Sequence, residues 1–175
     1  MVDSPDMRLL ILGLLAVAGA FAQKIEIEFD QSVDFSRFKT FAIRDGKLNS
    51  KNPSLNNELI RKRIDADIQK FFEARGLEFT PSGRSDLNVR YTLGAAARMQ
   101  REVYPAGWRG WGTRVVRVPY TEGTLVIDLR DPSTRSLVWR AIARAEKSDA
   151  SQIEAKLDDM VKKSCEKYPP KPKKP

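Results

Sequence analysis

Apolar and polar residues alternate in six stretches of the chain, and this alternation predicts strands. The stretches are KIEIEFD (24–30), RFKTFAI (37–43), DLNVRYTL (86–93), GTRVVRVPY (112–120), TEGTLVIDL (121–129) and SLVWRAIARAE (136–146). A period of two residues places apolar side chains on one face of a strand and polar side chains on the other. The polar segment RDGKLNSKNPS (44–54), which is rich in turn residues, indicates a loop.

Between the second and third strands the apolar period lengthens to that of a helix. The apolar positions are Leu55, Leu59, Ile60, Ile64, Ile68, Phe71 and Phe72, which line one helical face. Asn52 or Ser54 can cap the amino end, and Pro53 suits the first helical position. Gly76 can adopt the left-handed conformation that commonly ends a helix. The pattern predicts a helix over 54–75.

A second helix is predicted near the carboxyl end. Ser151 and Glu154 have the spacing of a capping box, in which each side chain bonds the other residue's backbone. The apolar stripe that follows consists of Ile153, Leu157, Met160, Val161 and Cys165. Because Cys165 lies on this stripe, it is better explained as a small buried hydrophobic residue than as a nucleophile.

These elements give the order ββαββββα, which is typical of an α+β fold. We expect a mostly antiparallel sheet with two amphipathic helices packed on one face. Residues 23–168 form a single domain in this interpretation. The tail 169–175, PPKPKKP, is expected to be disordered because its prolines forbid a helix and its lysines keep it solvated.

The first part of the chain resembles a secretory signal peptide, predicted over 1–22. The uncharged apolar run 9–22 is shorter than the roughly 20 residues of a membrane-spanning helix. It ends in Ala-Phe-Ala, which suits cleavage before Gln23. A start at Met7 instead of Met1 would give a more conventional basic beginning. The alternative to a signal peptide is that this apolar run forms a buried amino-terminal helix. We expect an exported protein of the periplasm.

Composition excludes several kinds of chemistry. The chain has one Cys and no His, which excludes an intramolecular disulfide, histidine-dependent triads, Cys-His proteases and His-containing zinc or haem sites. We expect no catalytic residues, no metal site and no cofactor. The formal net charge of +8 supports solubility and weak attraction to anionic surfaces. Export argues against nucleic acid as a partner.

Asp128 and Asp131 raise the question of whether the fifth and sixth strands carry a carboxylate site. Catalysis by two carboxylates requires both to converge on a substrate. DPSTR (131–135) has the composition of a tight turn, since Asp131 can accept backbone N–H groups and Pro132 presets φ. Arg140 or Arg144 could pair with Asp128 across the hairpin. We therefore favour a structural hairpin over a reactive pair.

Several of these stretches resemble the DUF4136 family. The resemblance rests on DFSRFKTFAI (34–43), SDLNVRYTL (85–93) and above all YTEGTLVIDLRDPSTRSLVWRAIA (120–143), and it runs from about Phe29 to Lys167. It implies an α+β domain of the bacterial envelope, of unassigned function, and it supplies no catalytic residue. Many relatives are lipoproteins, but Gln23 stands where a lipid-modified Cys would be needed.

The segment 98–117, RMQREVYPAGWRGWGTRVVR, is the richest candidate for binding. The candidate residues are Arg98, Arg101, Tyr104, Trp108, Arg109, Trp111 and Arg114. Aromatic faces can stack on sugars, bases or cations, and glycine lets the backbone bend in what is expected to be a loop between strands. The alternative is that the tryptophans cover the sheet edge or the core. Trp139 lies within a strand pattern and is expected in the core.

Two classes of function follow. The first is a non-catalytic envelope module that binds an unknown protein or polymer through 98–117. The alternative is a small hydrolase that uses carboxylates such as Asp128 and Asp131 on an anionic or glycan substrate. A third, weaker hypothesis is a binder of polyanions. Three lysines in the tail, Lys171, Lys173 and Lys174, give at most a weak attraction to an anionic membrane.

Overall fold

The computed structural model describes residues 24–106, 112–147 and 150–171, with the side chains of 96–106, 112–121 and 147 excepted. The predicted signal peptide 1–22 lies outside the described residues, and so does most of the predicted tail. None of the helices in the described ranges is both long and apolar enough to cross a membrane.

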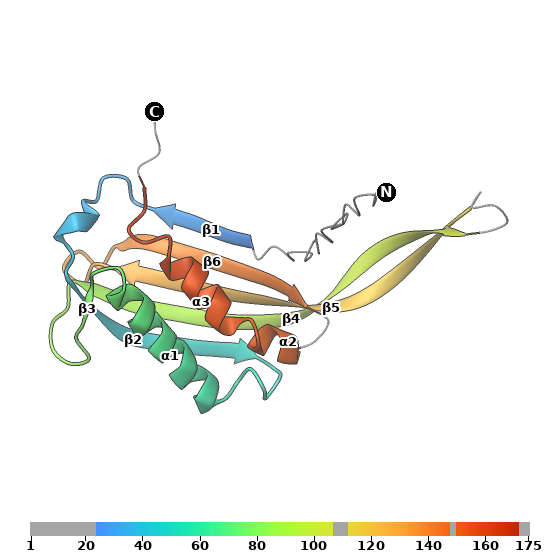
Figure 1. Cartoon of the computed structure of the whole chain (residues 1–175), viewed down its shortest axis with the longest axis horizontal. Coiled ribbons are helices and arrows are strands. Elements are labelled where there is room, and N and C mark those ends of the chain that lie inside the picture. Colours follow the sequence, from blue (N-terminus) through green and yellow to red (C-terminus); the bar gives the residue numbers. More distant parts are fainter. Residues whose placement is uncertain (1–23, 107–111, 148–149, 172–175) are drawn as a thin grey trace, which may run out of the picture.

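Six strands form one sheet in the spatial order β1-β6-β5-β4-β2-β3 (Figure 1). The strands are β1 (Lys24–Phe29), β2 (Thr40–Ser50), β3 (Glu78–Phe79), β4 (Leu87–Ala106), β5 (Gly112–Arg130) and β6 (Leu137–Lys147). β1, β6, β5 and β4 pair antiparallel, whereas β2 runs parallel to both β4 and β3. The predicted α+β fold with a mostly antiparallel sheet is confirmed.

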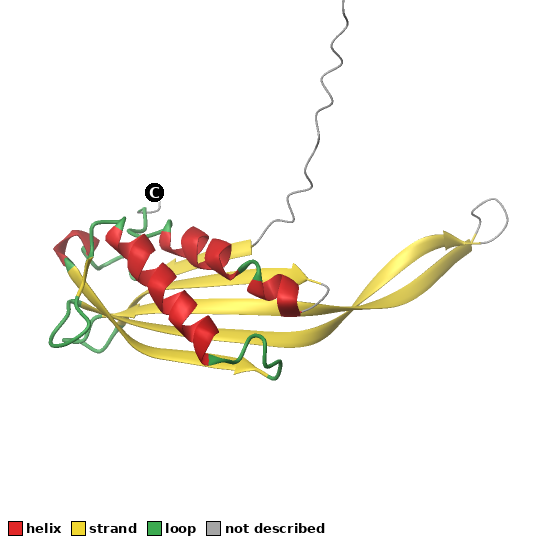
Figure 2. Cartoon of the chain, turned by 60° about the horizontal axis from the view of Figure 1, so that its bottom comes forward, coloured by secondary structure: helices red, strands yellow, loops and turns green. Residues whose placement is uncertain are grey.

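The helices lie on one face of this sheet (Figure 2). They are α1 (Glu58–Glu73), α2 (Ala150–Glu154) and α3 (Leu157–Cys165), and a short 3-10 helix, η1 (Phe35–Arg37), precedes β2. α1 packs against α3 as well as against the sheet. We call this side the covered face and the other side the open face.

α1 begins four residues later than the sequence pattern predicts. Its amino-terminal cap is Asn57, whose side chain accepts from the N–H of Ile60 at 3.0 Å. Asn52 instead closes a turn by accepting from the backbone N–H and the hydroxyl of Ser54. Gly76 follows the helix with a φ of 85°, so the predicted carboxyl-terminal signal is confirmed and the predicted cap is wrong.

The terminal helix is divided in two. α2 begins at Ala150, so Ser151 lies inside the helix and does not stand before it as a cap. α3 then carries Met160, Val161 and Cys165 into the core. Cys165 is fully buried, and this burial raises the pKa of its thiol well above the usual range. The prediction that Cys165 is a buried core residue is confirmed.

The core lies between the covered face and the helices. Trp139 from β6 is its largest fully buried side chain, as predicted, and contacts Phe72 from α1 with ring centroids 6.2 Å apart. Tyr168, which follows α3, contacts both rings. These contacts join α1, β6 and the segment that follows α3.

The strand lengths differ most from the sequence pattern. The predicted strands 112–120 and 121–129 are one continuous strand, β5. β2 extends to Ser50 through a bulge between Ile43 and Asp45, where a loop was expected. β3 was not predicted, since two residues carry no periodicity. β4 continues past Leu93 to Ala106, which has consequences for the candidate site.

Candidate functional site

The segment predicted as a binding loop is mostly a two-stranded ribbon. β4 loses its β2 neighbour after Ala95 and β5 gains its β6 neighbour only at Thr121. Between these points, residues 98–106 and 112–120 pair only with each other among the described residues, from Arg98 opposite Tyr120 to Ala106 opposite Gly112. At about 3.4 Å per residue, this ribbon is about 30 Å long. It projects beyond the helices (Figure 1).

The ribbon contains four of the seven candidate binding residues. Arg98, Arg101 and Tyr104 lie on β4 and Arg114 on β5, with Tyr104 directly opposite Arg114. Trp108, Arg109 and Trp111 lie outside the residues whose structure is described. The predicted loop is therefore corrected to a ribbon.

Asp128 is held by a cross-strand partner on the open face. Arg140 lies directly opposite it in register and donates from Nε to Oδ1 at 2.7 Å and from Nη2 to Oδ2 at 2.8 Å. Both carboxylate oxygens are occupied by this bidentate contact, a geometry that favours an arginine–carboxylate pair. Of the two predicted partners, Arg140 is the one observed. Arg144 pairs with Glu26 instead.

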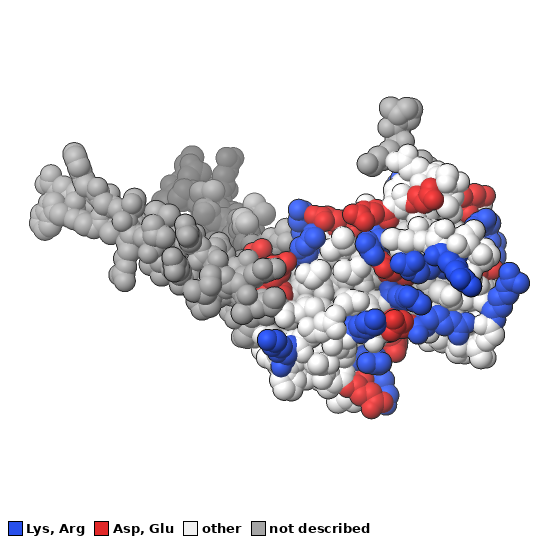
Figure 3. All heavy atoms as spheres, turned by 180° about the vertical axis from the view of Figure 1, so that it is seen from behind, with Lys and Arg blue, Asp and Glu red and all other residues white. Residues whose placement is uncertain are grey.

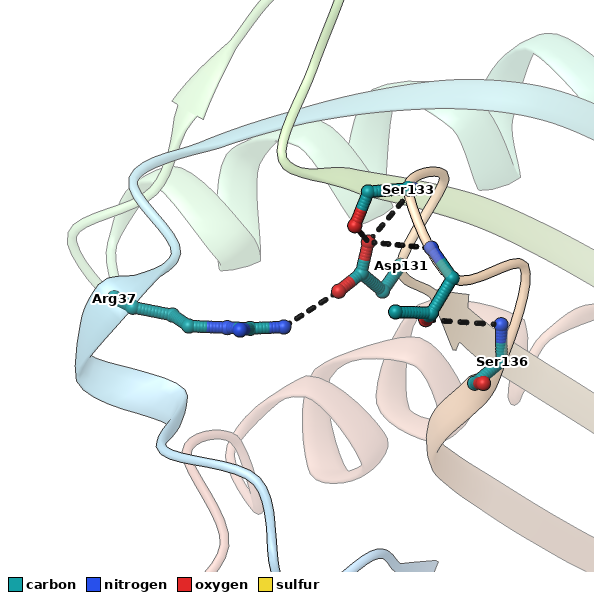
Figure 4. A network of polar contacts seen from close by, with 5 residues as sticks. Arg37, Asp131, Ser133 and Ser136 are labelled. Atoms are coloured by element: carbon teal, nitrogen blue, oxygen red, sulfur yellow. Dashed lines mark hydrogen bonds and ion pairs between the residues drawn. The ribbon is translucent and has the colours of Figure 1, made fainter.

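Asp131 organises the turn between β5 and β6 (Figure 4). Its Oδ1 accepts from the N–H and hydroxyl of Ser133 and from the N–H of Thr134, and its Oδ2 accepts from Arg37. The side chain of Asp131 is only 5% exposed. The hydrogen bonds from Ser133, together with the nearby charge of Arg37, lower the pKa of Asp131 despite its burial. This carboxylate fixes the turn and ties it to η1.

The open face carries a charged end (Figure 3). Lysines and arginines gather at one end of it, while its middle is largely uncharged. The register places five alternating charges in one row across the strands: Glu28, Arg140, Asp128, Arg90 and Asp45. Neighbours of opposite sign stabilise such a row.

A hollow of about 360 Å³ lies beside this row and below the turn. It is lined by Asn88, Arg90, Arg130, Asp131, Pro132 and Arg135. We call it the arginine hollow. The three arginines come from different places: Arg90 from β4, Arg130 from the end of β5, and Arg135 from the turn. Arg130 donates to the carbonyl oxygen of Arg135 at 3.3 Å.

A second hollow, of about 190 Å³, shares Asp131 and Pro132 with the first and is also lined by Arg37 and Asp86. Arg84 lines it as well, and its nearby charge helps to lower the pKa of Asp86. The other charged groups have hydrogen-bond partners. Arg37 donates to Asp131, and Asp86 accepts from the backbone N–H groups of Lys39 and Thr40 at 2.9 Å each. This hollow therefore serves the connection between η1, β2 and β4.

Sequence reasoning missed the arginine hollow. Arg90 and Arg130 occupy polar positions in strand patterns, where an arginine is usually only a solvated side chain. The sequence does indicate that they share a face of the sheet, because Arg90 lies two residues after Asn88 and Arg130 lies two residues after Asp128. The convergence itself depends on which strands pair and in which register.

Within the described residues, no three acidic or cysteine side chains come together in a way that could hold a metal ion. Asp128 and Asp131 are each engaged in the contacts described above. What the geometry offers is a projecting ribbon and a basic hollow at the other end of the sheet.

Two solved structures are similar to this chain. A PDZ domain protein from Parabacteroides distasonis ATCC 8503 superposes with a TM-score of 0.59 at 14% identity, over 84% of this chain and 35% of that one. The chain thus matches about a third of that protein's length. The PelC dodecamer from Paraburkholderia phytofirmans gives a TM-score of 0.48 at 10% identity, over 82% and 94% of the two chains. At these identities the first likeness shows a shared fold alone.

No curated protein matches the sequence. The family model of DUF4136, described as a domain of unknown function, matches residues 25–170. The match begins in β1, ends just after Tyr168, and includes every helix and strand in between. The chain therefore belongs to the DUF4136 family.

Proposed function

We propose that the protein is exported to the bacterial envelope and acts there as a non-catalytic binding module, with the ribbon as its contact element. The observation that carries this proposal is the extension of β4 and β5 beyond the sheet. In residues 98–106 and 112–120 each strand has one described neighbour, and the helices lie over the sheet elsewhere.

A two-stranded ribbon in water is only marginally stable, because it has no further layer against which to bury a face. Its outer edges also present backbone N–H and C=O groups that can pair with another strand. The ribbon sequence includes Val103, Val115, Val116 and Val118, residue types that favour strands and apolar contacts. A partner that covers the ribbon would supply the missing layer.

Two further features support an envelope location. The predicted leader over 1–22 has the apolar run and the Ala-Phe-Ala ending of a secretory signal. The match to the DUF4136 family begins just after this segment, at residue 25. The carboxylate-hydrolase alternative gains no comparable support, since Arg140 occupies Asp128 and the turn occupies Asp131.

The ribbon can be removed with little change to the body. Ala97 and Thr121 are directly opposite in register, so replacing residues 98–120 by Asn-Gly should join them through a two-residue hairpin turn. The full chain and this shortened variant, each carrying a photo-reactive cross-linker, would be incubated with envelope extract, and cross-linked partners identified by mass spectrometry. We expect the shortened variant to keep its melting temperature and to lose the partner.

A matched control is Leu59→Ser, which removes an apolar side chain that is 76% exposed on α1, outside the ribbon. This variant should capture the same partner as the parent chain. Equal partner sets for the parent and the shortened variant would refute the role of the ribbon. Export is tested separately by cell fractionation and amino-terminal sequencing: Gln23 as the first residue of periplasmic protein is expected, and an uncleaved cytoplasmic chain would contradict it.

A further inference from the structure

We propose that the arginine hollow binds a phosphate group, carried by a small molecule or by a lipid headgroup. This site lies on the sheet body and uses no residue of the ribbon, so it is independent of the proposed contact with a partner. Three arginines, Arg90, Arg130 and Arg135, line one hollow. Guanidinium forks match the spacing of phosphate oxygens and can bind them in pairs.

The acidic side chains around the hollow are already engaged. Asp128, next to Arg90 in register, gives both oxygens to Arg140. Asp131 lines the hollow, but its oxygens accept from Arg37, Ser133 and Thr134. Among the side chains that the structure describes, none forms an ion pair with Arg90, Arg130 or Arg135. Asp45, opposite Arg90 on β2, lies 3.9 Å from Lys47. The three arginines therefore bring positive charge to the hollow that no direct ion pair among these side chains neutralises.

Like charges placed together raise the free energy of the fold, and an anion relieves this repulsion. Here the pairing of the strands holds the arginines close together. Arg90 and Arg130 are fixed by the pairing of β4 with β5, in which Asn88 stands opposite Arg130. The Asn88 side chain is itself held, because its Oδ1 accepts from Ser85 and from Arg44.

The backbone at Arg135 gives a second, independent indication. Its φ is 60°, the left-handed region, and it is the single residue other than glycine with positive φ in the described part of the chain. An L-residue is disfavoured there because its Cβ comes too close to the backbone, whereas glycine has no Cβ and is favoured. Strain retained at a surface turn points to a role for the residue, and Arg135 lines the hollow.

The size of the hollow fits a phosphate with part of its carrier. Sites for small organic ligands usually measure roughly 300–1,000 Å³, and the arginine hollow, at about 360 Å³, lies at the lower end. Asn88 adds an amide that can bond a hydroxyl group, and Pro132 adds an apolar wall. A phosphate on a sugar or a glycerol unit suits this lining.

The test is a titration followed by NMR through the Nε–Hε signals of the arginines, at about 0.15 M sodium chloride so that non-specific attraction is screened. The probes are inorganic phosphate and glucose phosphate. Phosphatidylglycerol vesicles, compared with phosphatidylcholine vesicles in co-sedimentation, test a lipid source. Saturable shifts confined to Arg90, Arg130 and Arg135 support the site. Binding of the soluble probes or of the vesicles identifies the source.

The variants Arg90→Gln and Arg135→Gln should each weaken binding about tenfold or more, as expected for loss of a charge-assisted hydrogen bond. Arg61→Gln is the matched control, because it removes the same charge from an exposed position on α1 and should leave binding unchanged. Arg135→Gly separates binding from folding: it relieves the left-handed strain, so it should raise the melting temperature while it weakens binding.

Non-saturating shifts, or equal losses in Arg61→Gln and Arg90→Gln, would overturn the proposal, since both indicate only general charge attraction. Absence of binding by all soluble probes and by both kinds of vesicle would overturn it as well. The chain without residues 98–120 should still bind phosphate, so failure of this site and failure of the ribbon proposal give different results.

Discussion

The two faces of the sheet use the same strands for different purposes. Along β5, Leu125, Ile127 and Leu129 are fully buried under the helices, whereas Val126 and Asp128 between them are only half-buried on the open face. On the covered face, stability depends on apolar area and close packing. On the open face it depends on charge pairs of modest strength, so charge can be arranged for binding at little cost to the fold.

The largest expected effect on stability is that of Trp139→Ala on the covered face. Trp139 is fully buried against Phe72 and Tyr168, so the free energy of unfolding should fall by about 3–5 kcal/mol. Urea unfolding followed by circular dichroism measures this. Trp139→Phe, which keeps an aromatic ring, is the control and should lose less. A loss below about 1 kcal/mol for the alanine variant would mean that the covered face is not the main source of stability.

Two glycines on neighbouring strands give a matched comparison of the faces. A Cβ on Gly123, on the covered face, would lie 2.6 Å from Cγ2 of Ile153 in α2, whereas one on Gly94, on the open face, would meet nothing within 4 Å. Gly123→Ala should therefore cost about 1–3 kcal/mol through overpacking. Gly94→Ala should be neutral or slightly stabilising. Thermal unfolding of both variants measures the two changes in stability. Equal changes would contradict the difference in packing between the two faces.

A carboxyl pair between α1 and α3 predicts a pH effect. Burial, followed by the contact with Asp158, raises the pKa of Asp67 to about 6. Arg63, 2.6 Å from Asp158, lowers the pKa of Asp158, so Asp67 takes the shared proton. Because the pKa of Asp67 is higher in the folded chain than in the unfolded chain, protonated Asp67 contributes to the stability of the fold. This contribution is fully present below about pH 4 and is lost as the pH rises to about 6.

The variant Asp67→Asn keeps a donor toward Asp158 at every pH. It should match the parent chain near pH 4 and be more stable at pH 7, by about 1–2 kcal/mol after allowance for solvent screening. Asp159→Asn, which removes an acid paired with Lys163 on the same helix, should show no such pH-dependent gain. A constant difference across this range would contradict the shared proton.

The smallest expected effect concerns the Asp128–Arg140 pair on the open face. Its side chains are 15% and 33% exposed, and a double-mutant cycle with Asp128→Ala and Arg140→Ala should give a coupling of about 0.5–1 kcal/mol. Additive changes would show that the pair contributes nothing to stability. A coupling as large as the Trp139 effect would remove the contrast between the faces.

The sequence predicted elements whose signals are local. The helical stripe ending at Gly76 and the acidic turn after β5 could be recognised because periodicity and turn chemistry act over a few residues. The start of α1 was misplaced because asparagine caps helices and closes turns equally well. Asn52 accepts from Ser54 in the preceding turn, whereas Asn57 accepts from the N–H of Ile60 as the cap.

The ribbon and the arginine hollow depend on longer-range pairing. Gly94, Ala95, Ala96 and Ala97 have low strand propensity, so the alternating pattern that predicts β4 ends at Leu93. Pairing with β5 carries the strand through them. Likewise, Arg90, Arg130 and Arg135 are separated in sequence and come together only through the β4–β5 register and the left-handed turn.

The position of Tyr168 has a consequence for how the chain is completed. Its ring meets those of Phe35, Phe72 and Trp139, with centroids 5.9, 5.7 and 6.1 Å apart. A chain cut short before Tyr168 leaves these aromatic surfaces open to water, the kind of exposure that chaperones and proteases act upon. We expect a chain ending at Lys167 to be digested faster in limited proteolysis. Tyr168 thus makes the exposure of this aromatic cluster depend on whether the chain extends through residue 168.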